Sequence, residues 1–224
     1  MSITTAQRKL VWLSLFAIAM AHVEAALVAH LRSLYYPENP LAIFPLNLLS
    51  HRDLTIELTR ELATVMMIFS VALLTEKGLM RIFAAFVFVF GRWDIFYYAW
   101  LKVMIGWPTE WLEWDVLFLI PWPWLGPWIC PAVIALLFTL WGGRILLSPV
   151  VYFFNRSTAF VFLLGTAGCL LAFLLPAAVL LPGGEAAFQD YQPSGFSWWL
   201  FIIGYLLMTT GLLRVVTSGQ SSAR

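Results

Sequence analysis

Long apolar stretches, separated by short polar or proline-rich segments, follow one another along the whole chain. Each is close to the roughly 20 residues that a helix needs to cross the hydrocarbon core of a bilayer. No segment alternates apolar and polar residues as the strands of a membrane barrel do. Because backbone polar groups in lipid must be satisfied internally, these stretches predict helices. The predicted helices cover residues 10–30, 51–74, 79–101, 131–147, 158–181 and 197–213.

Residues at the boundaries support these helices. Ser50 stands three positions before Asp53, the spacing of a capping box, and predicts the start of the second helix. Pro131 suits the first turn of the fourth helix. Pro182 with the two glycines after it predicts the end of the fifth helix, and Pro176 predicts a kink within it.

Composition points to the same class of protein. Hydrophobic residues make up 62% of the 224 positions and charged residues only 11%, against about 25% charged residues in a soluble domain. We therefore expect an all-α, polytopic transmembrane bundle of six helices, forming a single integral membrane domain over residues 1–224. The bilayer is its expected surrounding, nucleic-acid binding is not expected, and Cys130 and Cys169 are expected to be small buried apolar residues.

The distribution of Lys and Arg predicts orientation, since these residues are enriched in cytoplasmic loops. Eight of the thirteen fall on the side of the N-terminus, which predicts that both termini are cytoplasmic. The eight are Arg8, Lys9, Lys77, Arg81, Arg144, Arg156, Arg214 and Arg224. An alternative is a cleavable signal ending at Ala19-Met20-Ala21. The apolar run that continues beyond Ala21 argues against cleavage.

Tryptophan and proline gather on the predicted outer side. Nine of the twelve Trp residues map there, and residues 116–131 contain four prolines. Such a segment cannot form one continuous helix, yet it is strongly apolar. We expect an interfacial or re-entrant segment, serving either as a membrane anchor or as an apolar roof over a site.

Ionisable residues lie on the first three predicted helices at similar depth in the outer half of the bilayer. Charged groups inside a bilayer usually face the bundle interior and often mark function. Residues 1–115 are therefore expected to be the functional half, and residues 116–224 an apolar scaffold. The candidates are His22, Glu24, Glu57, Arg60, Glu61, Arg92, Asp94, Tyr97, Tyr98 and Lys102.

Histidine with several carboxylates is a possible ligand set for a divalent transition metal. The candidate metal ligands are His22, Glu57, Glu61 and Asp94, and the candidate catalytic groups are His22, Glu61 and Asp94. Their spacing matches neither the Glu-x-x-His repeat of di-iron bundles nor a His-Glu-x-x-His motif. Haem is not expected, because His30 and His51 would lie near water.

The remaining candidates are expected to bind a ligand: Glu24, Arg60, Arg92, Tyr97, Tyr98 and Lys102. Glu24 is expected to pair with Arg60 or Arg92, and His22 to lie nearer the carboxylates. Arg60 and Lys102 would hold anionic groups, and the tyrosines would orient them.

Three short segments, 91–98 (GRWDIFYY), 106–108 (GWP) and 114–121 (WDVLFLIP), with His22 and Arg60-Glu61, resemble a group of uncharacterised bacterial membrane proteins. The resemblance implies a bacterial inner-membrane setting and no activity.

Three functions follow as hypotheses. The leading one is a polar pocket in the outer leaflet that binds a small amphipathic or lipid-like molecule or a metal; an enzymatic role would need the metal. The second is a structural or assembly subunit, whose charges lock helices together or dock a partner. The third is a proton-coupled carrier, which the lack of an internal repeat disfavours. The sequence assigns no oligomeric state.

Overall fold

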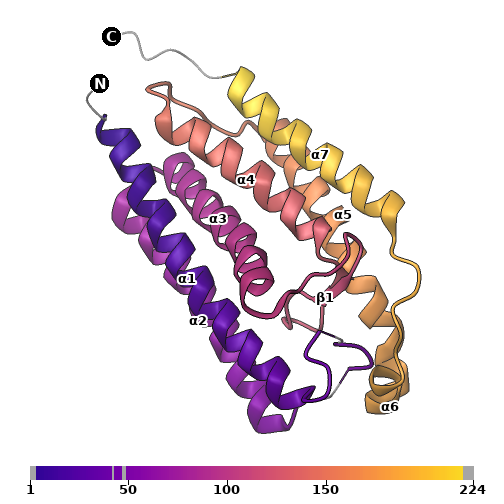
Figure 1. Ribbon diagram of the computed structural model, residues 1–224. Helices are drawn as coiled ribbons and strands as arrows, with labels where there is room; N and C mark the ends of the chain where they lie inside the picture. Colours follow the sequence, from indigo (N-terminus) through magenta and orange to yellow (C-terminus); the bar gives the residue numbers. More distant parts are fainter. Residues whose placement is uncertain (1–3, 42, 47–48, 219–224) are drawn as a thin grey trace.

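Helices form most of the chain in the computed structural model, which describes residues 4–41, 43–46 and 49–218 (Figure 1). Arg224, one of the residues used to predict orientation, lies outside this range. The elements are α1 (Thr5–Tyr35), α2 (His51–Thr75), α3 (Leu79–Ile105), β1 (Trp114–Val116), β2 (Leu125–Pro127), α4 (Ile129–Leu147), α5 (Arg156–Leu180), the 3₁₀ turn η1 (Leu181–Gly183), α6 (Gly184–Gln189) and α7 (Trp198–Thr217). The fold is therefore all-α with one small hairpin.

The ends of the helices follow local chemistry. Ser50 caps α2 by accepting a hydrogen bond from the Asp53 N–H, and Pro131 lies in the first turn of α4, both as predicted. The first helix is longer than predicted, because Thr4 and Gln7 form a capping box before it and it continues to Tyr35.

Five helices are long and apolar enough to cross a membrane: α1, α2, α4, the continuous segment Arg156–Gln189, and α7. The helix α3 is not one of the five. It packs against α1, α2 and α4 and lies in the middle of the bundle (Figure 1). Length and composition thus agree with a multi-pass membrane protein.

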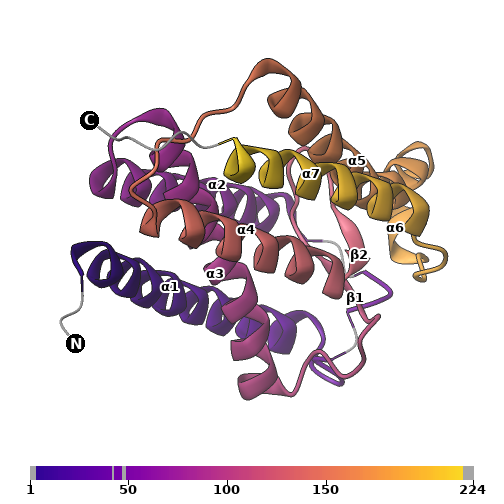
Figure 2. The ribbon, with the colours of Figure 1, turned by 90° about the horizontal axis from the view of Figure 1, so that it is seen from above.

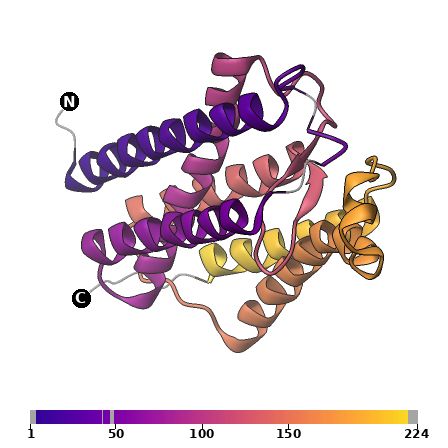
Figure 3. The same cartoon turned by 90° about the horizontal axis from the view of Figure 1, so that it is seen from below.

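The helices form two groups. In the views from above and below (Figures 2 and 3), α1 lies on one side of the molecule and the α5–α7 pair on the other. Both ends of the described chain lie at the same end of the bundle, opposite α6 (Figure 1). Among the described residues, α2 packs extensively only on α3. Polar contacts therefore supply much of what holds α2 to its other neighbours.

Glycines allow α5 and α7 to approach closely. A Cβ atom at Gly165 would lie 2.6 Å from the Gly204 carbonyl oxygen, and one at Gly204 would lie 2.6 Å from the Cys169 nitrogen. Small residues serve this purpose at helix contacts in membranes, where lipid provides no hydrophobic drive for association. Cys130 and Cys169 are free and buried in the same core.

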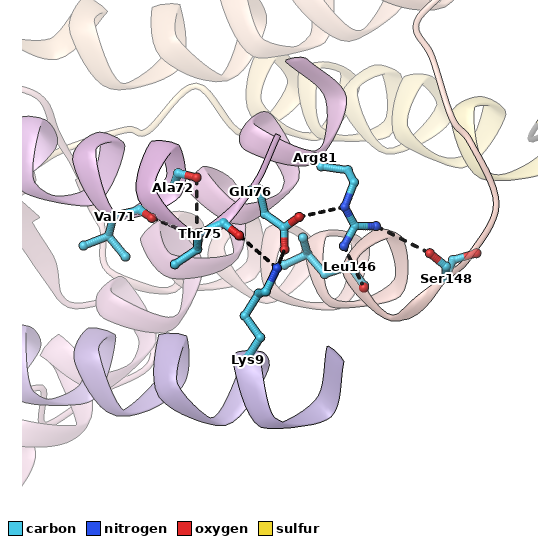
Figure 4. Close-up of polar contacts among 8 residues, drawn as sticks. All are labelled: Lys9, Val71, Ala72, Thr75, Glu76, Arg81, Leu146 and Ser148. Atoms are coloured by element: carbon cyan, nitrogen blue, oxygen red, sulfur yellow. Dashed lines mark hydrogen bonds and ion pairs between the residues drawn. The ribbon is translucent and has the colours of Figure 1, made fainter. Parts of the chain in front are cut away.

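A polar network fastens the end of the bundle that carries the termini (Figure 4). The Lys9 ammonium donates to Glu76 Oε1 at 2.7 Å and to the Thr75 carbonyl at 2.8 Å. Arg81 Nε donates to Glu76 Oε2 at 2.7 Å, and its Nη2 donates to the Leu146 carbonyl at 3.2 Å. Burial alone would raise the pKa of Glu76, but the hydrogen bonds from Arg81 and Lys9 outweigh it and lower the pKa below its ordinary 4.5. One carboxylate thus joins α1, α2 and α3.

Candidate functional site

A cavity of about 770 Å³ occupies the half of the bundle away from the chain termini, and we call it the chamber. The later turns of α1 and α3, the first turns of α2, and the hairpin surround it, with α4, α5 and α6 completing the wall. Because successive helices run in opposite directions, the end of α1, the start of α2 and the end of α3 meet at one depth. This is the convergence that the sequence predicts for the ionisable residues.

The chamber is lined in part by polar residues. Seven of the ten candidates line it: Glu24, Glu57, Arg60, Glu61, Asp94, Tyr97 and Tyr98. The rest of the lining is mostly apolar and comes mainly from residues beyond position 115, including Leu117, Leu119, Ile134, Phe138, Leu170 and Phe173. The second half of the chain therefore does more than support the first, because it supplies most of the apolar lining.

Arg60 lies between two carboxylates. Its Nη1 donates to Glu24 Oε1, and its Nε donates to Glu57 Oε2 at 2.8 Å. The Glu24–Arg60 pair predicted from the sequence is confirmed. Since both sides of the guanidinium are engaged, Arg60 balances carboxylates and is not arranged to hold an anionic ligand, which departs from its predicted role.

Glu61 fastens the hairpin to α2. The Leu119 N–H lies 3.0 Å from each carboxylate oxygen, and Glu61 is only 5% exposed. The hairpin joins β1 and β2 as antiparallel strands, with Asp115 opposite Gly126. Trp122 ties its tip to α5 by donating from Nε1 to the Leu174 carbonyl at 3.2 Å. The tryptophan- and proline-rich segment is thus a hairpin held at several points, a form that its sequence pattern did not predict.

A second buried ion pair holds the base of the hairpin. Arg32 Nη2 lies 3.1 Å from Asp115 Oδ1, with both side chains almost fully buried, and the Arg32 guanidinium lies 4.0 Å above the Trp107 ring. Burial raises the pKa of Asp115 to about 6, and Arg32 opposes that rise. Neither residue was among the predicted site residues, because the first helix was predicted to end before Arg32 and no element was predicted around Asp115, which lies in β1. The only sequence signal was a charge within a strongly apolar segment.

Several buried polar atoms in residues that line the chamber have no hydrogen-bond partner among the described residues. They are Asp94 Oδ2, Asp115 Oδ2, Arg32 Nη1 and Trp93 Nε1. Buried polar groups in proteins are nearly always paired, with protein, water or a ligand. The four atoms are themselves covered by surrounding atoms, so they form an incompletely hydrogen-bonded polar layer behind the chamber lining.

Three of the ten candidate residues do not line the chamber. One of them is His22, which was predicted to lie near the carboxylates. It is exposed, with its ring 5.0 Å from that of Trp100. His22 and Glu24 point in directions about 200° apart, so Glu24 facing α2 turns His22 away. Lys102 donates to the Gly106 and Pro108 carbonyls at 2.9 and 2.7 Å, so it caps the end of α3 outside the chamber.

Arg92, the third, also does not line the chamber. Its guanidinium lies 5.5 Å from the Phe88 ring centre, and its Nε has no partner within the described part of the chain.

The structure does not bring the four predicted metal ligands together. Among the described residues, no three His, Cys, Asp or Glu side chains are placed to hold a metal ion. The proposed set fails because His22 points away from the chamber while Glu57 and Glu61 are engaged with Arg60 and Leu119. Because His22 points away from the chamber, it is also separated from Glu61 and Asp94, the other two candidate catalytic groups.

Comparison with protein-family models, with curated proteins and with solved structures finds no match to this chain. The feature of the described residues that bears on function is the chamber, whose lining holds five carboxyl groups of the first 115 residues among many apolar side chains.

Proposed function

We propose that the protein is a six-span protein of the bacterial inner membrane whose chamber binds a small amphipathic, lipid-like molecule. The single observation that carries this proposal is a cavity of about 770 Å³ whose lining combines several charged groups with many apolar residues. Small-molecule sites typically measure about 300–1,000 Å³ and combine apolar lining with a few placed polar groups.

The membrane placement rests on charge and chain direction. In the proposed topology, α3 is the sixth membrane-spanning helix and its neighbours shield it from lipid. Both chain termini are then cytoplasmic. The basic residues Lys9, Lys77 and Arg81 lie near the start of α1 and at the turn between α2 and α3, and the enrichment of Lys and Arg in cytoplasmic loops favours this end of the bundle as the cytoplasmic one. The chamber then opens in the outer leaflet, and the hairpin is its roof.

Packing around α2 supports access from the membrane. Besides its packing on α3, this helix is held near the chamber by Arg60 to Glu24 and Glu61 to Leu119. Polar contacts between sparsely packed helices can separate without opening a close-packed core. An amphipathic molecule would enter beside α2 with its apolar part still in lipid.

The second candidate function is a structural or assembly subunit. The observation that favours it is the pairing of Arg60 and Arg32 with carboxylates from other elements, which would lock helices together. It does not account for Asp94, whose carboxylate forms no ion pair with the described residues and lines the cavity.

Filling the chamber tests the proposal. Ile134 lines the chamber, whereas Leu136, on the same helix, is 50% exposed and would face lipid. After mild detergent extraction, native mass spectrometry of the wild type should show one retained amphipathic molecule. Ile134→Trp should lose it and Leu136→Trp should keep it. Equal retention by both variants, or none by the wild type, would contradict the proposal.

A further inference from the structure

A second cavity, of about 830 Å³, is lined by the start of α3, the end of α4, the start of α5 and the linker between α4 and α5, and we call it the groove. Among the described residues, none lines both the groove and the chamber. The elements around the groove meet at the end of the bundle that carries the chain termini (Figure 1). The two cavities therefore lie towards opposite ends of the molecule.

Three phenylalanine rings form an apolar cluster in the lining of the groove. Phe83 of α3, Phe154 of the linker and Phe162 of α5 have ring centres 5.6–5.8 Å apart. Other residues of the lining carry large apolar side chains that are exposed: Leu79, Val151, Phe153 and Leu163. On a bundle that crosses a membrane, exposed apolar side chains of this kind are placed to contact lipid chains.

The charged residues of the groove lining are basic. They are Lys77 and Arg81, and no acidic residue lines the groove in the part of the chain that the structure describes. Lys77 is exposed and forms no ion pair with the described residues. The carboxylate beside Arg81, that of Glu76, is shared with Lys9. Base therefore exceeds acid at this end of the bundle, and an anionic group is the complementary ligand.

Hydrogen bonds hold the polar residues of the groove in place. Arg81 Nη2 donates to the Leu146 carbonyl at 3.2 Å (Figure 4). In the linker, the Ser148 hydroxyl lies 2.9 Å from the Tyr152 hydroxyl and accepts from the Val150 N–H at 3.1 Å. Both Ser148 and Tyr152 line the groove. A site that is ordered before binding loses less conformational freedom when a ligand enters it.

We propose that the groove binds an anionic phospholipid from the leaflet on the side of the chain termini. Its headgroup phosphate would lie beside Lys77 and Arg81, and an acyl chain would cover the three phenylalanines. Basic pockets between membrane helices bind anionic lipid headgroups, whereas a soluble anion would leave the apolar lining uncovered. The inference concerns a second site and does not depend on which molecule the chamber binds.

The test compares lipids that differ only in the headgroup. Palmitoyl-oleoyl phosphatidylglycerol and phosphatidylcholine are titrated into the purified full-length protein, and native mass spectrometry gives the dissociation constant of the first bound lipid. Phosphatidylglycerol should bind at least about fivefold more tightly. Excess glycerol phosphate, which has the headgroup charge but no chain, should not displace it. Equal affinities for the two lipids, or displacement by glycerol phosphate, would overturn the inference.

Charge variants connect the preference to the groove. Lys77→Gln should weaken phosphatidylglycerol binding about fivefold and leave phosphatidylcholine binding unchanged. Arg52→Gln removes the same charge at an exposed position at the start of α2, outside the groove, and should change neither. Equal effects of the two variants would show that net charge sets the preference, which would overturn the inference.

Filling variants test the apolar part of the groove. Ala159→Trp places a large side chain in the groove and should abolish the preference for phosphatidylglycerol. Ala167→Trp, at an exposed position of the same helix outside both cavities, should keep it, and so should Ile134→Trp, which fills the chamber. Because Lys77 is exposed, Lys77→Gln decides the case if Ala159→Trp does not fold.

Two results would assign the preference or the groove to something else. Loss of the preference in Ile134→Trp and not in Ala159→Trp would place the lipid in the chamber. A wild-type dimer that disappears only in Ala159→Trp would show that a second copy of the chain occupies the groove. Either result would overturn the inference.

Discussion

The side chains of Arg32 and Asp115 form an ion pair of 3.1 Å between elements 83 positions apart in the chain. Arg32 is 5% and Asp115 3% exposed. The pair joins the end of α1 to the base of the hairpin, beside Trp107. It therefore holds together the two parts of the chain that close the chamber.

Removing one partner of this pair should be costly. Arg32→Met or Asp115→Leu leaves a buried charge without its partner, which typically lowers the free energy of unfolding by about 3–5 kcal/mol. The double variant should lose much less than the sum of the two. Unfolding titrations in mixed micelles measure these values, and additive losses would show that the residues do not act as a pair. Arg52→Met, at an exposed position, should stay within about 0.5 kcal/mol of the wild type.

Glu61 should control the opening of the hairpin. A hydrogen bond to a charged group contributes about 1.5–3 kcal/mol, so Glu61→Ala should expose the Leu119 amide to solvent more often. Hydrogen exchange at Leu119 should then be faster by roughly tenfold or more. Glu61→Gln, which keeps one acceptor, should show a smaller effect. The control is Leu62→Ala, at a position 54% exposed, and identical exchange in all variants would refute the role.

Much of the fold and part of the site could be predicted from the sequence. The stripe Glu57, Glu61 and Thr64 has helical spacing and contains intramembrane charge, and all three residues are buried in the structure. Periodicity also shows that His22 and Glu24 point apart, but only the packing of α1 against its neighbours decides which of them faces α2. For this reason the sequence could not predict that His22 lies away from the carboxylates, beside Trp100.

The hairpin could not be predicted in the same way. Its strands have three residues each, too few for a repeating pattern, and prolines separate them. The pairing of Arg32 with Asp115 depends on where this non-helical segment folds back, which no local spacing encodes. For the same reason the ion pair that closes the chamber was absent from the predicted site.

The contact between α5 and α7 should tolerate no added volume. At Gly165 a new side chain would meet the α7 backbone, and overpacking of this kind typically costs about 1–3 kcal/mol. Gly165→Val should lower the unfolding free energy accordingly. Gly195→Ala is the matched control, because a Cβ there meets no atom within 4 Å. A loss that is equal in the two variants would contradict the close-packed arrangement.

The network around Glu76 should make stability depend on acidity. Its pKa in the folded protein lies below the ordinary value of 4.5, so the folded state favours the carboxylate. The resulting stabilisation is present above pH 4.5 and is lost as the pH falls through the lower, folded-state pKa. Glu76→Gln should remove this part of the acid dependence, whereas Glu38→Gln, at an exposed position, should preserve it. Parallel pH profiles for the wild type and Glu76→Gln would contradict the expectation.

The most direct test of the chamber as a binding site is photo-crosslinking with a decylamine that carries a diazirine on its chain. After irradiation in lipid nanodiscs, peptide mapping locates the modified residues. The chamber predicts labelling of the apolar lining at Leu119, Ile134 and Phe173, which excess unlabelled decylamine suppresses. Labelling confined to lipid-facing positions such as Leu136 and Leu163, unaffected by the competitor, would contradict it.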